Sequence, residues 1–323
     1  MDFEDIYKEF EPVSLKDWSM IQSFLDKSSY EESNHNIVNM MLWLKEYPLF
    51  AKIEEHYLLL LGIHEGKLFI YMPLGEKEYY REAILDAKQI FDFYKIPFTL
   101  SCFTKDMVDV VISIFPEYEA IEERAAADYV YEAEKLRTFA GKKMQKKRNH
   151  LNAFLKEYEG RWLYESLNEE NVIDCLDFLE KWRPDDPDDF LQSERLGVEK
   201  VLRLVNVLPY KGGLIRIDGK VEAFAIGSRL SSRMAQENIE KANGEIRGLY
   251  QLILREWLSH EYPQVELINR EDDTGRENLR HAKMSLHPLY LIEKYRIQRG
   301  NRDDSTGFTI SDGRSKTIME SLF

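Results

Sequence analysis

The sequence lacks the cysteine and histidine patterns that mark disulfide-rich and zinc-binding proteins. Its two cysteines, Cys102 and Cys175, are far apart and form no CxxC pair. We therefore expect them to be reduced thiols of a cytosolic protein. The seven histidines include no HExxH pair and no cluster with cysteine, which argues against a zinc site. We expect no bound metal.

The sequence also lacks a long apolar run. Its strongest run, residues 57–63, is far shorter than the ~20 residues that cross a bilayer. Residues 1–6 are acidic and contain no apolar signal region. These features predict a cytoplasmic protein without a transmembrane segment, which would meet any lipid substrate at the membrane surface.

Positive charge is scarce except in one segment. The formal net charge is −14, which argues against a surface that holds nucleic acid by overall charge. Between Lys135 and His150, however, the chain has seven Lys and Arg residues and no acid. In a helix that starts near Gly141, apolar residues line one side and basic residues the other. The basic side contains Lys142, Lys143, Lys146, Lys147 and His150.

This basic segment predicts an anion site. Its candidate ligands are coenzyme A phosphates, a tRNA backbone or an anionic lipid headgroup, and its candidate binding residues are Lys143, Lys146 and Arg148. A solvated lysine face that pairs with acids elsewhere would explain the same charges. The sequence alone leaves both interpretations open.

The length and the order of elements indicate two domains. A chain of 323 residues exceeds the size at which a single core stops growing, about 250–300 residues. The first half predicts two strands, a helix, a strand, a helix and a strand, and a similar order returns from residue 211. We expect an α+β fold in which a mixed sheet is flanked by helices in each of two domains, 1–125 and 126–299, followed by a flexible tail at 300–323. Two unrelated α+β halves are the alternative.

The stretch from residue 233 to 290 shows the most distinctive pattern. Residues 233–242 alternate in character with a period of two, which favours a strand. A glycine-bearing turn at 243–248 follows, and then a helix from Leu249 to about His260. Residues 265–268 predict a short buried strand, which ends at the polar run 269–273.

A strand, a glycine turn and a helix in this order can bind a phosphate. The first amides of a helix lack partners within the helix and lie at the positive end of its dipole. Lys241, Gly244, Arg247 and Gly248 are therefore candidate residues for binding a donor's phosphates. In the simpler interpretation, one glycine ends the strand and the other tightens helix packing, because short glycine patterns often occur by chance.

The stretch resembles the acyl-donor half of the GNAT acyltransferase superfamily. The segments 240–250 and 269–275, followed by 279–285 and Pro288, look like an uncharacterised bacterial family. That family is related to the C-terminal catalytic domain of phosphatidylglycerol lysyltransferases. The resemblance covers roughly residues 20–297, and it implies two GNAT-like folds in tandem. It also implies that the basic segment lies beside the donor site.

The turn departs from the usual superfamily pattern, which is Arg or Gln, two residues, Gly, one residue, and Gly or Ala. Here the nearest match has Lys241 at the first position, Gly244 in the middle and a bulky Ile246 at the last. Acyl-CoA is one donor that the resemblance implies. Relatives such as Fem-type aminoacyltransferases take an aminoacyl-tRNA, so a tRNA partner is the other.

Acyl transfer needs a base, oxyanion stabilisation and a donor held in register. Glu237 on the polar strand is one candidate base, although an ordinary surface acid would look the same. Asp272 lies at a strand end, where ligands of α/β sheets tend to bind, or it caps the next helix. Lys283 is a candidate for holding a carbonyl oxygen, unless it pairs with an acid.

Asn269 and Arg280 complete the candidate substrate site. Asn269 lies at the same strand end, and Arg280 shares a helix face with Lys283. No Ser-His-Asp or Cys-His arrangement stands out, which favours direct transfer without a covalent enzyme intermediate. The sequence thus predicts transfer of an acyl or aminoacyl group to an amine or hydroxyl of a small molecule or lipid headgroup. The alternative is a non-catalytic protein of the same fold that binds an anionic ligand.

Overall fold

The computed structural model describes residues 3–64, 66–182 and 188–300. The chain forms two compact units, which we describe separately. Unit 1 contains residues 1–29, 43–126 and 293–323, and unit 2 contains residues 30–42 and 127–292. The predicted tail lies outside the described residues, apart from Gly300. Within the described residues, no helix is both long and apolar enough to cross a membrane.

Unit 1 is built on a mixed sheet with the strand order β1-β2-β3-β4-β6-β15-β7, in which β5 pairs with β3 beside this path. Most neighbours are antiparallel, while β4 and β6 run parallel. The strands are β1 (Glu11–Pro12), β2 (Leu49–Ile53), β3 (Tyr57–His64), β4 (Lys67–Ile70), β5 (Leu74–Gly75), β6 (Leu100–Phe103), β7 (Tyr118–Glu122) and β15 (Tyr295–Arg299). The α-helices are α1 (Trp18–Leu25), α3 (Tyr80–Phe93) and α4 (Lys105–Ile114).

Unit 2 is built on a second mixed sheet, with the order β14-β8-β13-β12-β11-β10-β9. Its strands are β8 (Asp128–Glu132), β9 (Trp162–Ser166), β10 (Tyr210–Ile217), β11 (Lys220–Arg229), β12 (Met234–Ala242), β13 (Leu267–Asn269) and β14 (Tyr290–Ile292). Its helices are α2 (Ile37–Trp43), α5 (Ala133–Thr138), α6 (Gln145–Glu157), α7 (Val172–Lys181), α8 (Asp189–Leu202), α9 (Leu249–Glu261) and α10 (Glu277–Met284). Two mixed sheets with flanking helices confirm the expected α+β class.

Two segments belong to a different unit from the segments that precede them in the chain. The chain from Tyr290 to Arg299 breaks after Ile292 into strands of two sheets. β14 pairs with β8, while β15 pairs with β6 and β7 of unit 1. In the other direction, residues 30–42 leave the first part of the chain and belong to unit 2.

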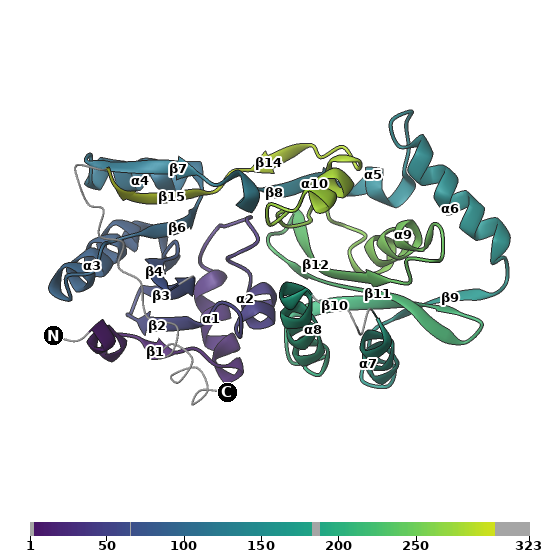
Figure 1. Cartoon of the computed structure of the whole chain (residues 1–323), viewed down its shortest axis with the longest axis horizontal. Helices are drawn as coiled ribbons and strands as arrows, with labels where there is room; N and C mark the ends of the chain where they lie inside the picture. Colours follow the sequence, from purple (N-terminus) through teal and green to yellow (C-terminus); the bar gives the residue numbers. More distant parts are fainter. Residues whose placement is uncertain (1–2, 65, 183–187, 301–323) are drawn as a thin grey trace. The chain divides into compact units, whose positions relative to one another are not determined.

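Helices cover both faces of the second sheet (Figure 1). α9 packs on β10, β11 and β12 together with α5 and α6, whereas α7 packs against β11 from the other face. The predicted helix from Leu249 to His260 is confirmed as α9, whose fully buried Trp257 is the largest buried side chain. The predicted helix from Gly141 is confirmed only in part, because α6 begins at Gln145.

A bulge in β12 determines which of its side chains share a face. Glu237 pairs with Gly227 and Ile239 pairs with Ile226, so Asn238 is an extra residue in the register. Side chains three apart in a regular strand point to opposite faces, but one extra residue restores them to the same face. Glu240 pairs with Ala225, so it lies on the same face as Glu237.

The edge of β12 that faces β13 is open beyond the bulge. The parallel pairing of β12 with β13 ends at Gln236 and Asn269. Among the described strands, none pairs with this edge between Glu237 and Ala242. The second half of β12 therefore presents side chains and backbone to the space where β13 ends.

Candidate functional site

A cluster of buried charges occupies the place where β12 and β13 separate. The Arg270 guanidinium, directly after β13, forms ion pairs through Nε with Glu237 Oε2 and through Nη2 with Glu240 Oε2. The exposed fractions of these side chains are 15% for Arg270, 4% for Glu237 and 11% for Glu240. Two carboxylates thus share one guanidinium with little access to water. The interpretation of Glu237 as an ordinary surface acid is wrong.

One of the two carboxyls holds a proton near neutral pH. Burial raises the pKa of Glu240 well above its usual range, and the negative charge of Glu237 raises it further, while Arg270 opposes the shift. Two carboxylates that share one site cannot both ionise cheaply. With one proton, Glu237, Glu240 and Arg270 together are electrically neutral, and a carboxyl that exchanges a proton near pH 7 suits general acid–base chemistry.

This cluster makes stability depend on pH. In the unfolded chain Glu240 releases its proton near its ordinary pKa of 4.5, whereas in the folded chain its pKa is about 8. Between these values the folded state binds more protons, so we expect the free energy of unfolding to fall as pH rises from about 5 to 8. When the free energy of unfolding in urea is plotted against pH, the slope should be shallower for Glu240→Gln than for wild type. Glu271→Gln serves as a comparison, because the pKa of Glu271 is also raised. An unchanged slope in Glu240→Gln would contradict the cluster's protonation.

Unsatisfied polar atoms concentrate on the same strand. Among the described residues, five buried side-chain atoms have no hydrogen-bond partner, and they belong to Asn39, Gln236, Glu237, Asn238 and Glu240. Four of the five residues lie in the bulged segment of β12. The fifth, Asn39, donates to the same carbonyl, Ser33 O, as Gln236. Since buried polar groups are normally paired, such a concentration is typical of a functional segment.

Basic residues of α6 lie beside the start of α9. The backbone of Gly248, immediately before α9, packs against the His150 carbonyl on α6. Burial lowers the pKa of His150, and the charges of Arg247, Lys146 and Lys147 lower it further. The basic segment and the glycine turn, about 100 residues apart in the sequence, therefore meet. We call Lys146, Lys147, His150 and Arg247 the basic cluster.

The basic cluster is close to the charged cluster on β12. Burial lowers the pKa of the half-buried Lys147, with the charge of Arg270 as the next cause, while Glu240 opposes the shift. At the start of α9, the backbone N–H groups of Arg247 and Gly248 have no acceptor among the described residues. Positive side chains and free amides thus surround one helix start, as an anion site requires.

The two glycines of the turn have different structural roles. Gly248 has a φ of 89°, and a Cβ there would lie 2.3 Å from the His150 carbonyl oxygen. Gly244 is exposed, and a Cβ there would meet nothing within 4 Å. The simpler interpretation of a glycine that tightens helix packing therefore describes Gly248, whereas Gly244 leaves its side of the turn open.

We expect Gly248→Ala to destabilise the protein. A left-handed backbone conformation costs an alanine about 1–3 kcal/mol. The close contact of its Cβ with the His150 carbonyl oxygen adds to this cost, because neither atom can move away without a shift of the backbone. Gly219→Ala is the matched control, since Gly219 has a similar φ of 82° but open space around it. Urea unfolding should show a larger loss for Gly248→Ala than for Gly219→Ala. Equal losses would mean that α6 and α9 are not packed tightly here.

The other predicted residues after β13 stabilise a loop. The Lys283 ammonium donates to the carbonyl oxygens of Arg270, at 2.6 Å, and of Asp272. Burial lowers the pKa of Lys283. Glu271, between these carbonyls, has a φ of 58°. Lys283 thus holds the backbone on both sides of the strained Glu271, through the carbonyl oxygens of Arg270 and Asp272.

Arg280 and Asn269 are also satisfied by protein atoms. Arg280 donates two hydrogen bonds to Asp273, at 2.7 and 3.0 Å. Burial acts to raise the pKa of Asp273, but the hydrogen bonds from Arg280 and Tyr129 outweigh it and lower the pKa to about 2. The buried Asn269 amide donates to Asp128, at 2.9 Å, and to the Glu31 carbonyl. The partner of Arg280 is therefore Asp273, the acid that follows Asp272.

Three further predicted residues are not part of the basic cluster. Lys241 lies on the opposite face of β12, where its ammonium pairs with Glu194 and lies 4.3 Å from the centre of the Trp182 ring. Arg148 donates to the carbonyl oxygens of Phe139 and Gly141, so it stabilises the turn before α6. Lys143 is exposed in that turn.

Sequence reasoning did not single out Arg270, Glu240 and Lys147 as site residues. Arg270 carried a signal, since it directly follows a buried strand. Glu240 gave none, because its face depends on the bulge. Among the described residues, no group of three His, Cys, Asp or Glu side chains is arranged to hold a metal ion.

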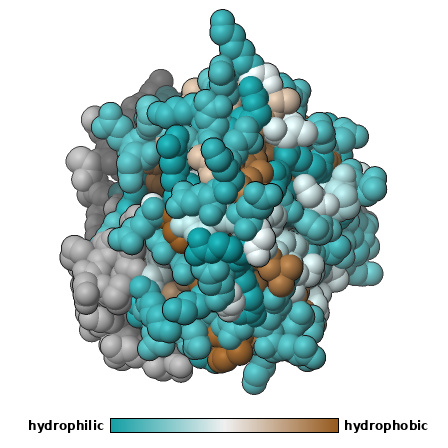
Figure 2. Space-filling view, turned by 90° about the vertical axis from the view of Figure 1, so that its right-hand side faces the viewer, coloured by the Kyte–Doolittle hydropathy of each residue, from teal (hydrophilic) through white to brown (hydrophobic). Residues whose placement is uncertain are grey.

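The surface around α6 and β9 is mainly hydrophilic (Figure 2). Apolar residues appear on this face as scattered spots and not as a continuous area. Single exposed apolar residues are normal on soluble surfaces. The face of unit 2 that carries α6 and β9 is therefore polar.

Comparison with known proteins identifies the family. A profile of the family described as phosphatidylglycerol lysyltransferase, C-terminal, matches residues 27–298. The chain belongs to this family. The lysyltransferase C-terminal family thus covers both units and every residue of the candidate site.

Solved structures show that the fold is shared. A conserved protein of unknown function from Bacteroides thetaiotaomicron is 28% identical, with a TM-score of 0.83 over 90% of this chain and 99% of that one. L-PGS from Bacillus licheniformis is 11% identical, with a TM-score of 0.65 over 97% of both chains. An uncharacterised protein of Mycoplasmoides gallisepticum is 27% identical over 183 residues, which are 56% of this chain and 59% of the relative's length. The lysyltransferase C-terminal fold is therefore present over nearly the whole chain.

Proposed function

We propose that the protein transfers an acyl or aminoacyl group from acyl-CoA or aminoacyl-tRNA to an amine or hydroxyl acceptor. Membership of the lysyltransferase C-terminal family and the shared fold support this reaction class. The observation that carries the proposal is the buried carboxylate pair on β12, with its unpaired oxygens, beside the basic start of α9. The acceptor would be a small molecule or a lipid headgroup met at the membrane surface.

The donor's phosphates would bind at the basic cluster. Arg247 is exposed and, among the described residues, has no ion-pair partner, so its charge is available to a ligand. Lys146 is exposed on the neighbouring helix, and the backbone N–H groups of Arg247 and Gly248, at the start of α9, have no acceptor among the described residues. In a protein with a net charge of −14, a local concentration of positive charge is what an anionic donor needs.

The carboxylate pair would supply the base. Glu237 or Glu240 takes the proton of the acceptor, the acceptor's nitrogen or oxygen bonds to the acyl carbon, and the sulfur or ribose oxygen of the donor leaves with a proton. Arg270 and Lys147 would stabilise the negative charge that develops on the carbonyl oxygen. Lys283 and Asp272 would act as positioning residues, because they fix the loop that carries Arg270.

A donor-binding experiment tests the proposal first. Thermal shift with acyl-CoAs, aminoacyl-tRNA and anionic lipid vesicles should show stabilisation that grows with the logarithm of donor concentration. Arg247→Ala should weaken donor binding about 10-fold or more, the effect of one charge-assisted hydrogen bond. Lys143→Ala, from the same basic segment but outside the basic cluster, should change little. Equal stabilisation by every polyanion would show a charged surface and no donor site.

The second candidate is a binding protein without chemistry. The bulky Ile246 and the packed Gly248 favour it, because they leave less room at the turn than two small residues would. Donor binding without any transferred product would support this alternative.

A further inference from the structure

A cavity of about 850 Å³ lies on the side of the glycine turn that the proposed phosphate site does not use. Its walls are α7, the hairpin of β10 and β11, and the end of β12 with the turn that follows. Gly244 and Glu245 belong to the cavity wall. Arg247, two residues later in the same turn, belongs to the basic cluster. Its volume is in the range of small-ligand sites.

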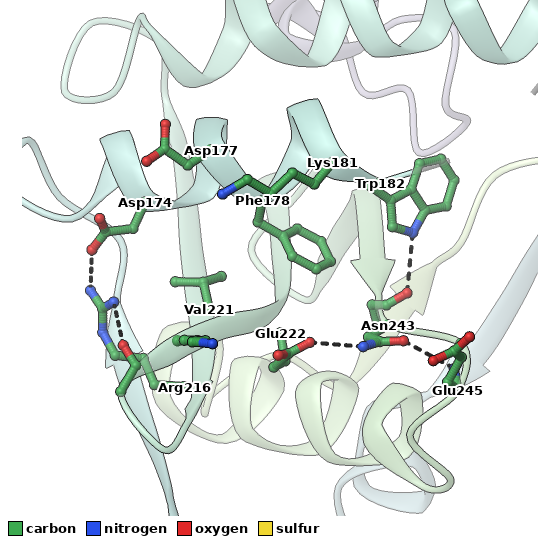
Figure 3. A pocket seen from close by; sticks show the side chains of 14 residues that line it. Asp174, Asp177, Phe178, Lys181, Trp182, Arg216, Val221, Glu222, Asn243 and Glu245 are labelled. Carbon is green, nitrogen blue, oxygen red and sulfur yellow. Dashed lines mark hydrogen bonds and ion pairs between the residues drawn. The ribbon is translucent and has the colours of Figure 1, made fainter. Parts of the chain in front are cut away.

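The floor of the cavity is aromatic and apolar (Figure 3). Phe178 lies on α7 and Trp182 directly follows this helix, and Phe178 points between Val221 and Trp182. The Trp182 indole donates to the Ala242 carbonyl at 3.1 Å, and Lys241 lies 4.3 Å from its ring centre. These contacts fix the orientation of the Trp182 ring. A flat aromatic group can stack on such a floor.

The rim of the cavity carries both charges. Arg216 is already used by Glu165 and Asp174, and Asn243 donates to Glu222 at 2.9 Å. Four rim residues remain: Asp177, Lys181, Lys220 and Glu245 are exposed, and none forms an ion pair within the described part of the chain. Two free ammonium groups suit a phosphate, while two free carboxylates suit N–H and hydroxyl donors.

We propose that this cavity binds the adenosine nucleotide portion of the donor. Adenosine offers a flat ring to the floor, an exocyclic amine and ribose hydroxyls to Asp177 and Glu245, and a phosphate to Lys181 and Lys220. The cavity lies on the α7 face of the sheet, whereas Glu237 and Glu240 lie on the α9 face. Acyl-CoA carries its adenosine at the end remote from the thioester, so it suits this arrangement. Aminoacyl-tRNA carries an adenosine at its acylated end, next to the reacting carbonyl, so it suits the cavity less well. The inference therefore rests on the proposed function, and it adds a second subsite on the other side of the same turn.

The charge balance of the rim excludes simpler anions as its preferred ligand. Inorganic phosphate would meet two lysines but also two carboxylates, and it offers nothing to the aromatic floor. Ribose 5-phosphate lacks the ring. Adenosine monophosphate satisfies all three features, so it should bind more tightly than either.

Titration calorimetry with adenosine monophosphate tests the site directly. Phe178→Ala should weaken binding about 5–100-fold, the range that loss of one base–aromatic stack gives. Lys220→Glu, on the exposed hairpin of β10 and β11, should also weaken binding of adenosine monophosphate. It reverses the charge of one rim residue without disturbing the packed side of α7. Phe93→Ala, an exposed aromatic of unit 1 that is 58% exposed, is the matched control and should leave binding unchanged. No binding, or equal binding by all four proteins, would overturn the proposal.

Two competition arms identify the source of the nucleotide. Coenzyme A and an oligonucleotide that ends in CCA should each be tested for displacing adenosine monophosphate, and the one that does so is the donor class. If Arg247→Ala weakens donor binding and Phe178→Ala does not, the cavity assignment fails while the donor site stands. If adenosine monophosphate binds through Phe178 but no transfer occurs with either donor, the cavity stands and the proposed function fails.

Discussion

Arg270→Met should lower the free energy of unfolding by about 3–5 kcal/mol, because removing one partner of a buried ion pair leaves uncompensated charge. Here the loss would leave Glu237 and Glu240 facing each other with 4% and 11% of their side chains exposed. Chemical unfolding at pH 7 measures the effect. It should be smaller at pH 5, where both carboxyls of the variant can take up protons.

Two variants give this result its controls. Arg161→Met removes the cation of the Arg161–Asp218 pair, whose side chains are 50% and 53% exposed, and should change stability little. Adding Glu237→Gln and Glu240→Gln to Arg270→Met should recover much of the lost stability, because no buried carboxylate is then left without its counter-ion. If Arg270→Met is as harmless as Arg161→Met, the charged cluster is not buried as described.

Glu237→Gln should slow acyl transfer by about 10²–10⁴-fold, the usual contribution of a general base. The amide keeps the size of the side chain but cannot accept the acceptor's proton. Donor affinity should remain unchanged, since the donor's phosphates bind at the basic cluster. The measurement is the turnover number and the donor's KM, compared with those of wild type and of Glu277→Gln, an exposed acid on α10.

A lower turnover number with an unchanged KM for the donor distinguishes loss of the base from misfolding. A misfolded variant would lose donor binding together with turnover, whereas a protein without its base keeps donor binding. Glu240→Gln should change the pH profile of the rate, because the raised pKa of Glu240 belongs to the same pair. Full activity in Glu237→Gln and in Glu240→Gln would remove the carboxylate pair from the mechanism.

Local patterns predicted the secondary structure around the site but not its side-chain geometry. The strand predicted over residues 233–242 and the helix predicted from Leu249 are both confirmed, because regular elements repeat at a nearly fixed period. The bulge at Asn238 breaks that period and gives no composition signal. Alternation alone therefore places Glu240 on the wrong face, away from Glu237 and Arg270.

The assignment of anion ligands depended on partners that a sequence does not reveal. Arg148 and Lys146 are equivalent in a count of basic residues, yet Arg148 donates to two carbonyls of the turn before α6. Arg280 and Lys283 are likewise used by Asp273 and by backbone oxygens. Only the fold separates the cations that stabilise the protein from those that remain available to a ligand.

The units were harder to predict than the elements. In residues 290–299 only Glu293 and Lys294 interrupt the strand formers, and this interruption does not indicate that β14 and β15 join different sheets. Residues 30–42 join unit 2 through buried polar contacts such as Asn36 with Ser228 at 2.8 Å. Such contacts link positions 192 residues apart, which no local pattern encodes.

The central claim is that β12 and the start of α9 form a transferase centre. Its most direct test is a single-turnover reaction with labelled acyl-CoA or aminoacyl-tRNA and a panel of amine and hydroxyl acceptors, read by mass spectrometry. The account predicts a transferred group on an acceptor with wild type, and its loss with Glu237→Gln at unchanged donor binding. Donor binding without transfer to any acceptor, or equal transfer by both proteins, would contradict it.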